Sequence, residues 1–576
     1  MINWKNIVCT LLLLSPVLLI KAQQKDSSNT ISDSSITAFV KTLQKRGADE
    51  TVRSIEKYKS GQLAIKQQHL IEEIKNYTQK AKILLKNRID SFLISKEIKS
   101  TSEYLEIAGD GVFKNKSNTQ SQRNLAVTAA IYTELLDRTT LRQKQISTYS
   151  KNLIELRDKI DSLNADPALY MFPNDSISTL KYIKKVIVVA KEIGPTDSAL
   201  TQSLASVQDL QNQVDMMVFT IHTALEDIEK YRRELTLLTF QRELANLDES
   251  KDSERSMSQI IAFSYAKEKL ALRFYINDYE GRILILFILI VFVTLFIRSL
   301  KNRLHTEAAL AGDFKGQLAL RHPFLSAIVI VTCLYQFVFI DPPFIFSFVL
   351  WSASAVCLSF IFRNYITRFW MLFWICMIAL FLAASFDNMI LQASETERTW
   401  VLSLAAVGAA YGIFLLLSKQ RKELKEKSLI YFIAFVVLAE SASIVANYLG
   451  RYNLSKTLLI SGYSGVIIAI LFLWTVRMIN EILGITSSTY KHADKKLFFI
   501  NFEKLGDKVP VIFYYFLVAG WLILISRHSY AFKQIVTPFN DFLTSERTLG
   551  DYTFSINGLF IFLLILICSM LFQQLY

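Results

Sequence analysis

Two spacings of apolar residues divide the chain near Arg282. Before this residue, apolar positions recur at alternating steps of three and four, which predicts amphipathic helices. After it, apolar stretches recur up to the last residue, and charged residues collect between them. We therefore predict an all-α protein, in which an exported domain of coiled-coil helical hairpins, residues 23–280, precedes a polytopic helical membrane domain.

Three runs of the first part carry narrow heptad seams. They comprise Leu70, Ile74, Tyr77, Ala81 and Leu84; Ile146, Tyr149, Leu153, Leu156, Ile160 and Leu163; and Leu200, Leu204, Val207, Val214, Met217, Ile221, Leu225, Ile228, Tyr231, Leu235 and Leu238. Such seams form inside one chain or between subunits, and heptad spacing alone favours neither. The domain is expected to be either a self-contained bundle or a rod that packs on neighbouring subunits.

Glycine and proline signals separate these runs. They are Gly109-Asp110-Gly111, Asp166-Pro167 with Pro173-Asn174, and Gly194-Pro195. Each is a helix-stop and turn signal, so helices should end at these three places. One shorter helix is expected over Ile177–Ile193.

The second part contains about nine apolar segments that we interpret as membrane spans. Several are near the lower length limit of a span, so their ends are approximate. Residues 281–525 hold eight accessory spans, and residues 526–576 hold an outer loop and a ninth helix. The segments are Ile283–Ile297, Phe324–Ile340, Phe344–Phe362, Trp370–Phe386, Val401–Leu417, Leu429–Leu449, Leu458–Val476, Val511–Ile525 and Ile556–Leu575.

The cationic residues between spans predict the direction of the membrane domain. Loops on one side carry eighteen Lys and Arg, five of them in residues 418–428, whereas loops on the other side carry six. Because cationic loops stay in the cytoplasm, the helical domain should be periplasmic and the C-terminus cytoplasmic. The protein is thus expected in the bacterial inner membrane as a multi-pass protein.

The first residues have the form of a secretory signal. Lys5 precedes an apolar run, Ile7–Ile20, and Lys21-Ala22-Gln23 follows it. We therefore interpret residues 1–22 as a signal peptide cleaved after Ala22. The alternative is an uncleaved N-terminal anchor.

Composition excludes several classes of function. Hydrophobic residues make up 52% of the chain, a share that indicates burial in a membrane. Much of the net charge of +13 lies in short loops between spans, where it favours contact with anionic lipid over nucleic acid. The five cysteines and six histidines form no metal-ligand spacing, and no catalytic motif is visible. We therefore expect neither an enzyme nor a cofactor.

Two small-residue pairs and one acidic residue stand out within the predicted spans. Gly408 and Gly412, and likewise Ser461 and Gly465, have spacings that let helices pack closely, more simply within the bundle than between subunits. Glu440 lies near the middle of the sixth predicted span. One interpretation is a protonated side chain with a structural role. The other is a proton or cation relay, which would need a second charged residue within the spans, and the sequence shows none.

The last predicted helix has a distinctive beginning. Gly550, Phe554, Ser555 and Ile556 precede a long aliphatic run. This lead-in, together with a signal peptide, a coiled-coil exported domain and a block of spans, resembles the large multi-span members of the small-conductance mechanosensitive channel family, with the potassium-dependent type as the nearest model. The family's pore-lining helix and cytoplasmic β domain do not occur before Tyr576. The resemblance therefore implies either that the chain is a piece of a channel whose pore lies beyond Tyr576, or that it is an accessory protein built from the same parts.

The resemblance implies a homo-oligomeric mechanosensitive ion channel, of which this chain supplies the tension-sensing and periplasmic portion, protecting cells against hypo-osmotic shock. Accessory helices that change tilt or area could couple bilayer tension to a conformational equilibrium. One alternative is a membrane-anchored periplasmic scaffold or sensor that binds an envelope partner. A weaker alternative is a secondary transporter that uses Glu440.

Overall fold

The computed structural model describes residues 33–116, 120–172, 176–237, 242–245, 255–306, 317–363, 365–423, 427–490, 511–528, 542, 545–549 and 552–555. Helices account for 88% of them. The strands in this part are β1 (Arg547–Leu549) and β2 (Tyr552–Phe554), which pair antiparallel with Thr548 opposite Thr553. The all-α class is confirmed, whereas the predicted signal peptide and the span at 556–575 lie outside the described residues.

The chain divides into two compact units. The first contains residues 1–88 and 150–205, and the second contains residues 89–149 and 206–576. Two long helices, α3 (Gln122–Asn164) and α4 (Ser176–Leu237), contribute to both units. The base of the helical domain therefore belongs to the same unit as the membrane helices.

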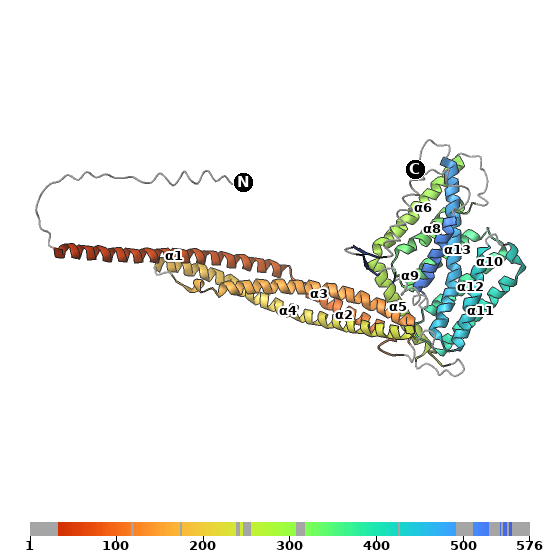
Figure 1. Ribbon diagram of the computed structural model, residues 1–576, viewed down its shortest axis with the longest axis horizontal. Coiled ribbons are helices and arrows are strands. Elements are labelled where there is room, and N and C mark those ends of the chain that lie inside the picture. Colours follow the sequence, from red (N-terminus) through yellow and green to blue (C-terminus); the bar gives the residue numbers. More distant parts are fainter. Residues whose placement is uncertain are drawn as a thin grey trace. The chain divides into compact units, whose positions relative to one another are not determined.

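The first unit contains α1 (Asp33–Lys86; Figure 1), the short helix η1 (Pro167–Tyr170) and the adjoining parts of α3 and α4. Leu70 and Ile74 of the first predicted seam are buried against Leu169 and Tyr182. The Tyr182 hydroxyl donates to the Leu169 carbonyl oxygen at 2.9 Å. The seam is thus buried within the chain in this unit.

The helix stop predicted at Gly194-Pro195 is wrong, because α4 continues through Pro195. Val189 and Ile193 before the proline belong to the apolar core of the first unit, and Leu200 after it is 1% exposed. An interior proline costs a helix about 3 kcal/mol. Burial of apolar side chains on both sides, at about 1.5–3 kcal/mol each, outweighs that cost.

Replacing Pro195 by alanine should stabilise this part of α4. Pro195 is exposed, so the substitution restores a backbone N–H donor without removing a buried contact. We expect slower amide hydrogen exchange over residues 176–205, corresponding to as much as about 3 kcal/mol. Gly194→Ala is the control, with a gain of about 1 kcal/mol. If both variants slowed amide exchange equally, the proline would not be the source of the local instability of α4.

The helical base of the second unit contains α2 (Ser91–Gly109) and α5 (Met257–Asp278), with the adjoining parts of α3 and α4. As the sequence predicts, α2 ends at Gly109, and Gly111 turns the chain with φ +73°. The apolar core of the base combines Leu125, Ile221 and Phe263 with Leu391, which lies between two membrane helices. The base therefore packs directly on the membrane domain.

The membrane domain begins with α6 (Glu280–Thr306), α7 (Leu318–Arg321), α8 (Pro323–Tyr335), η3 (Gln336–Val338) and α9 (Phe344–Phe362). It continues with α10 (Arg368–Asn388), α11 (Glu395–Leu417), η4 (Lys419–Glu423), α12 (Ser428–Tyr448), α13 (Tyr452–Tyr490) and α14 (Val511–His528). In the described part, six helices are long and apolar enough to cross a membrane: α6, α9, α10, α11, α12 and α13. The predicted span Phe324–Ile340 is instead a shorter apolar segment, Pro323–Val338.

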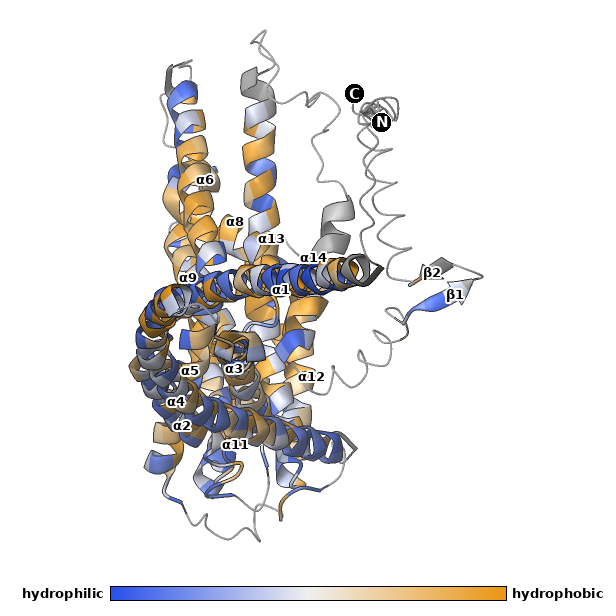
Figure 2. Ribbon diagram, turned by 90° about the vertical axis from the view of Figure 1, so that its left-hand side faces the viewer, coloured by the Kyte–Doolittle hydropathy of each residue, from blue (hydrophilic) through white to orange (hydrophobic). Residues whose placement is uncertain are grey.

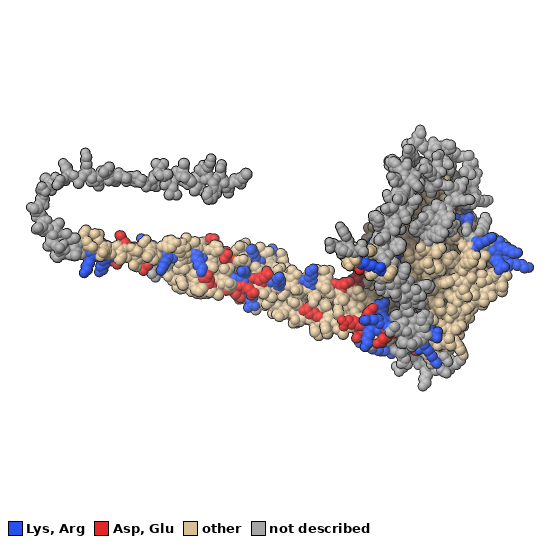
Figure 3. All heavy atoms as spheres, in the orientation of Figure 1, with Lys and Arg blue, Asp and Glu red and all other residues tan. Residues whose placement is uncertain are grey.

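The helix α13 forms the centre of the bundle. Its apolar window is 83% buried, compared with 28–44% for the other five. Figure 2 shows α6, α8 and α13 side by side with largely hydrophobic residues. In Figure 3, charged side chains of both signs follow the helical domain, whereas much of the visible surface of α10–α12 carries none. This pattern fits a bundle whose outer surface faces lipid.

Candidate functional site

The predicted glycine pair on α11 packs against neighbouring helices of the same chain. A Cβ atom at Gly408 would lie 1.9 Å from the Tyr463 hydroxyl oxygen, and one at Gly412 would lie 2.5 Å from Val437 Cγ2. The Tyr463 hydroxyl donates to the Leu404 carbonyl oxygen at 2.7 Å. Gly408 thus makes room for a tyrosine that bonds the backbone of α11.

The second predicted pair lies on α13. Ser461 is buried, and a Cβ at Gly465 would lie 3.2 Å from Phe435 of α12. The Trp521 indole nitrogen of α14 donates to the Gly465 carbonyl oxygen at 2.8 Å. Gly465 therefore lies where α12 and α14 both approach α13.

Replacing Gly408 by alanine should destabilise the bundle by about 1–3 kcal/mol, because a methyl group cannot fit beside Tyr463 without displacing it. Gly484→Ala is the matched control, since nothing lies within 4 Å of a Cβ at that position in α13. Thermal unfolding in detergent compares the two variants. Equal unfolding midpoints would show that Tyr463 moves aside at no cost.

Glu440 lies on α12 against α13. It is 0% exposed, and neither carboxylate oxygen has a hydrogen-bond partner among the described residues. A Cβ at Gly462 would lie 2.5 Å from Glu440 Oε1, so the carboxyl group occupies space that only a glycine leaves open. The predicted intramembrane acid is thus fully enclosed.

The predicted pore-module lead-in is described only in part. Phe554 ends β2 with 38% of its surface exposed, and Ser555 follows it. Gly550 and Ile556 lie outside the described residues.

A buried ion cluster, comprising Asp387, Glu397, Tyr452 and Lys456, was not predicted. All four side chains are at most 5% exposed. The Lys456 ammonium donates to Glu397 Oε1 at 2.7 Å, to the Ile390 carbonyl oxygen at 2.7 Å and to the Tyr452 hydroxyl at 3.2 Å. The cluster joins the ends of α10, α11 and α13.

Lys456 has no hydrogen left for Asp387. An ammonium group has three donors, and the three contacts above account for all of them. Asp387 Oδ2 lies 3.7 Å from Lys456 Nζ, an ion pair without a hydrogen bond, and both Asp387 oxygens lack a partner among the described residues. Two carboxylates therefore share one ammonium group.

The sequence did not predict the ion cluster, because its members fall in the loops that were expected between spans. Helix α11 begins at Glu395 and α13 at Tyr452, each six residues before the expected span. One signal was present: Ser394 and Glu397 have capping-box spacing, and the Ser394 hydroxyl accepts from the Glu397 backbone N–H at 3.1 Å. Reading that cap would have placed Glu397 inside the helix.

Beside the ion cluster, residues 242–245 of the helical domain contact the turn between α12 and α13. The backbone N–H groups of Glu243 and Leu244 donate to the Gly450 carbonyl oxygen at 3.1 and 3.0 Å. Gly450 has φ +74°, and a Cβ there would lie 2.1 Å from the Leu244 carbonyl oxygen. Arg398 donates to the Ala245 carbonyl oxygen at 3.0 Å. Only glycine fits this turn.

Asn453 extends this contact at the start of α13. Its backbone and side-chain N–H groups donate to Glu243 carboxylate oxygens at 2.9 and 3.0 Å, and its Oδ1 accepts from the Gln122 backbone N–H at 2.9 Å. Burial raises the pKa of Glu243, although the bonds from Asn453 act to lower it. We call these contacts of residues 242–245 with Arg398, Gly450 and Asn453 the junction.

The helical base contacts two further turns at the same end of the bundle. The Ser264 hydroxyl accepts from the Leu391 backbone N–H at 3.0 Å, in the turn between α10 and α11. The Tyr275 hydroxyl donates to the Ile340 carbonyl oxygen at 3.1 Å, in the turn before α9. Three separate turns of the membrane domain are therefore attached to the helical base.

Within the base, Lys267 of α5 is 0% exposed. Its ammonium donates to Asn124 Oδ1 at 2.6 Å and Thr128 Oγ1 at 3.0 Å, both neutral acceptors on α3. Burial lowers the pKa of Lys267 to about 7. Next to it, Glu268 pairs with Arg123 at 2.6 Å. A lysine with no bonded carboxylate thus lies close to an ion pair.

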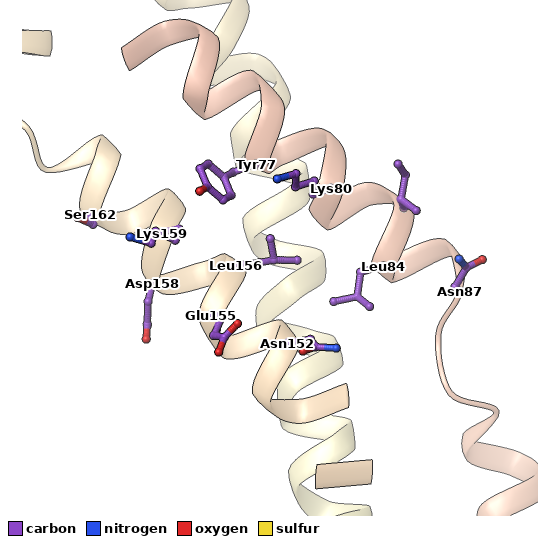
Figure 4. Close-up of a pocket in the computed structure, with 11 residues that line it drawn as sticks. Tyr77, Lys80, Leu84, Asn87, Asn152, Glu155, Leu156, Asp158, Lys159 and Ser162 are labelled. Carbon is purple, nitrogen blue, oxygen red and sulfur yellow. The ribbon is translucent and has the colours of Figure 1, made fainter. Parts of the chain in front are cut away.

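The first unit contains a groove of about 940 Å³ between α1 and α3 (Figure 4). Leu84 and Leu156 lie toward its floor, and its rim carries two cations, Lys80 and Lys159, and two carboxylates, Glu155 and Asp158. Because the two cations and two carboxylates cancel, the groove favours neither an anionic nor a cationic ligand.

The contacts at this end of the bundle link the helical domain to the membrane domain. In the described part of the chain, no group of three or more His, Cys, Asp or Glu side chains could hold a metal ion. The junction, Ser264 and Tyr275 connect the helical domain to three inter-span turns, and the ion cluster joins the ends of α10, α11 and α13. No protein-family model matches the chain, and a search of curated proteins finds no match.

Proposed function

We propose that this chain is the tension-sensing portion of a homo-oligomeric mechanosensitive channel of the bacterial inner membrane, with its helical domain in the periplasm and its C-terminus in the cytoplasm. The observation that carries the proposal is the attachment of the helical base to three inter-span turns. Bilayer tension favours states of larger in-plane area, in which spans tilt or separate. Such a movement would displace the three turns and, with them, the helical base.

The junction offers a specific test. In cells that depend on this protein to survive hypo-osmotic shock, Gly450→Ala should reduce survival, because the new methyl group meets the Leu244 carbonyl oxygen. Gly281→Ala is the matched control, since a Cβ there meets nothing within 4 Å. Membrane abundance is measured for both variants. A deletion strain that survives shock as well as the parent would refute the proposed function.

A second candidate is a membrane-anchored scaffold that binds a periplasmic envelope partner. It is favoured by the first half of α1, where large apolar side chains are exposed, including Phe39 at 64%, Leu43 at 52% and Val52 at 55%. Exposed apolar helix faces commonly mark interaction sites. Cross-linking from position 43 in whole cells, combined with normal shock survival of the deletion strain, would favour this candidate over the channel.

A further inference from the structure

One face of α12 carries a line of polar residues that leads to Glu440. Glu440, Ser443 and Asn447 are spaced by three and four residues, so they share one face of the helix. All three are at most 1% exposed. This face packs on α13, where Gly462 lies beside Glu440.

Toward the end of the bundle that carries the junction, Ser443 and Asn447 make hydrogen bonds to neighbouring helices. Ser443 Oγ lies 3.0 Å from Ser455 Oγ, within hydrogen-bond distance. Each hydroxyl also lies 2.9 Å from the other residue's carbonyl oxygen, to which it can donate instead. One turn further, the Asn447 amide donates to the Arg398 carbonyl oxygen at 2.7 Å. Polar groups therefore extend from Glu440 to the junction without an intervening apolar turn.

On the other side of Glu440 the interface is apolar. Val436 and Ile433 continue the same face of α12, and Val466, Ile467 and Ile470 continue α13, all at most 4% exposed. These five side chains offer no hydrogen-bond partner to water or to a proton. Of the α12 and α13 residues named here, the polar ones thus lie on the junction side of Glu440 and the apolar ones on the other side.

The groups around Glu440 favour a neutral carboxyl. The neighbouring titratable side chain, Tyr463, uses its hydroxyl proton on the Leu404 carbonyl oxygen. On α13, Lys456 is occupied by the ion cluster, and on α11 Arg398 bonds Ala245 and Asn447. An ionised carboxylate without donor or cation in a membrane interior is strongly disfavoured, whereas its protonated form is tolerated.

We propose that Glu440 is a proton-binding site inside the membrane domain, and that it exchanges its proton with water at the junction end along the Ser443–Ser455 pair. In the exchange, the O–H bond of the Glu440 carboxyl breaks, its proton passes to a water molecule, and a proton from water re-forms the bond. Since the opposite side is apolar, the site binds a proton without conducting it through the bundle.

Infrared spectroscopy of the whole protein in lipid nanodiscs tests this site. Protonated carboxyl groups have a carbonyl-stretch band that carboxylates lack, and the band shifts when the proton is replaced by deuterium. At neutral pH, a band present in the wild type should be missing in Glu440→Gln, which keeps the shape of the side chain. Asp387→Asn is recorded as well, so that the band of a second buried acid is not assigned to Glu440.

The route is tested by the rate at which this band shifts after transfer to heavy water. We expect the double variant Ser443→Ala with Ser455→Ala to slow the shift by roughly tenfold or more. Ser464→Ala is the control, because that buried hydroxyl bonds Ile460 of its own helix at 2.6 Å. The proposal fails if Glu440→Gln removes no band, if the band never shifts in the wild type, or if the double variant exchanges at the wild-type rate.

Discussion

Replacing Lys456 by methionine should destabilise the membrane domain by about 3–5 kcal/mol. Lys456 is the donor to Glu397 Oε1 and the cation nearest Asp387, and both carboxylates are 0% exposed. Methionine fills a similar volume but leaves two buried acids without an ammonium partner, and burying an unpaired charge is costly. Thermal or denaturant unfolding of the detergent-solubilised protein measures the loss.

Two further variants distinguish charge from packing at Lys456. Lys419→Met changes an exposed lysine in the turn after α11 and should leave the unfolding midpoint almost unchanged. The triple variant Lys456→Met, Glu397→Gln, Asp387→Asn removes all three charges and should recover much of the lost stability, because uncharged buried groups cost less than unpaired ions. A triple variant no more stable than Lys456→Met alone would show that packing dominates.

The stability of the helical base should fall as pH is lowered from about 10 to about 7, and Lys267→Met should abolish this dependence. The pKa of Lys267 is lowered by burial from 10.5 to about 7 in the folded protein. Above 10.5 the amine is neutral in both folded and unfolded chains and adds nothing. Between the two values only the unfolded chain binds the proton, so folding loses about 1.4 kcal/mol per pH unit. Below about 7 the loss is complete and constant, at up to about 5 kcal/mol.

The difference in unfolding free energy between wild type and Lys267→Met isolates this titration. The variant also strands Asn124 and Thr128, but that cost is independent of pH over this range. Its stability relative to wild type should therefore improve steadily as pH falls toward about 7. Lys269→Met, which removes an exposed lysine of the same helix, should show no such trend. A pH-independent difference for Lys267→Met would indicate that water reaches the ammonium group.

The helical architecture could be predicted from the sequence because apolar spacing reports directly on burial. Ile146, Leu153 and Ile160 of the second predicted seam are 0–2% exposed. Local stop signals were less reliable: Gly109 and Asp166 mark the ends that they predict, whereas Pro195 lies inside α4. A proline destabilises the helix locally, and whether the helix continues through it depends on the burial of side chains several turns away.

The polar site was only partly predictable. Glu440 stands out because its neighbours in sequence are apolar, but its hydroxyl-lined approach depends on Ser455, a residue of another helix. Asp387, Glu397 and Lys456 are ordinary loop residues by composition, and only the folding of three helix ends together buries them. The segment 242–245 likewise acquires its role through Gly450, two hundred residues away in the chain.

The central position of α13 has a consequence for biogenesis. This most buried span is the last of the six in chain order, so five spans leave the ribosome before the surface on which they pack exists. Lys456 emerges with it, and until then Asp387 and Glu397 lack their ammonium partner. The first five spans therefore lie in the bilayer, or bind an insertion chaperone, before α13 is inserted. The bundle then assembles in a late and cooperative step.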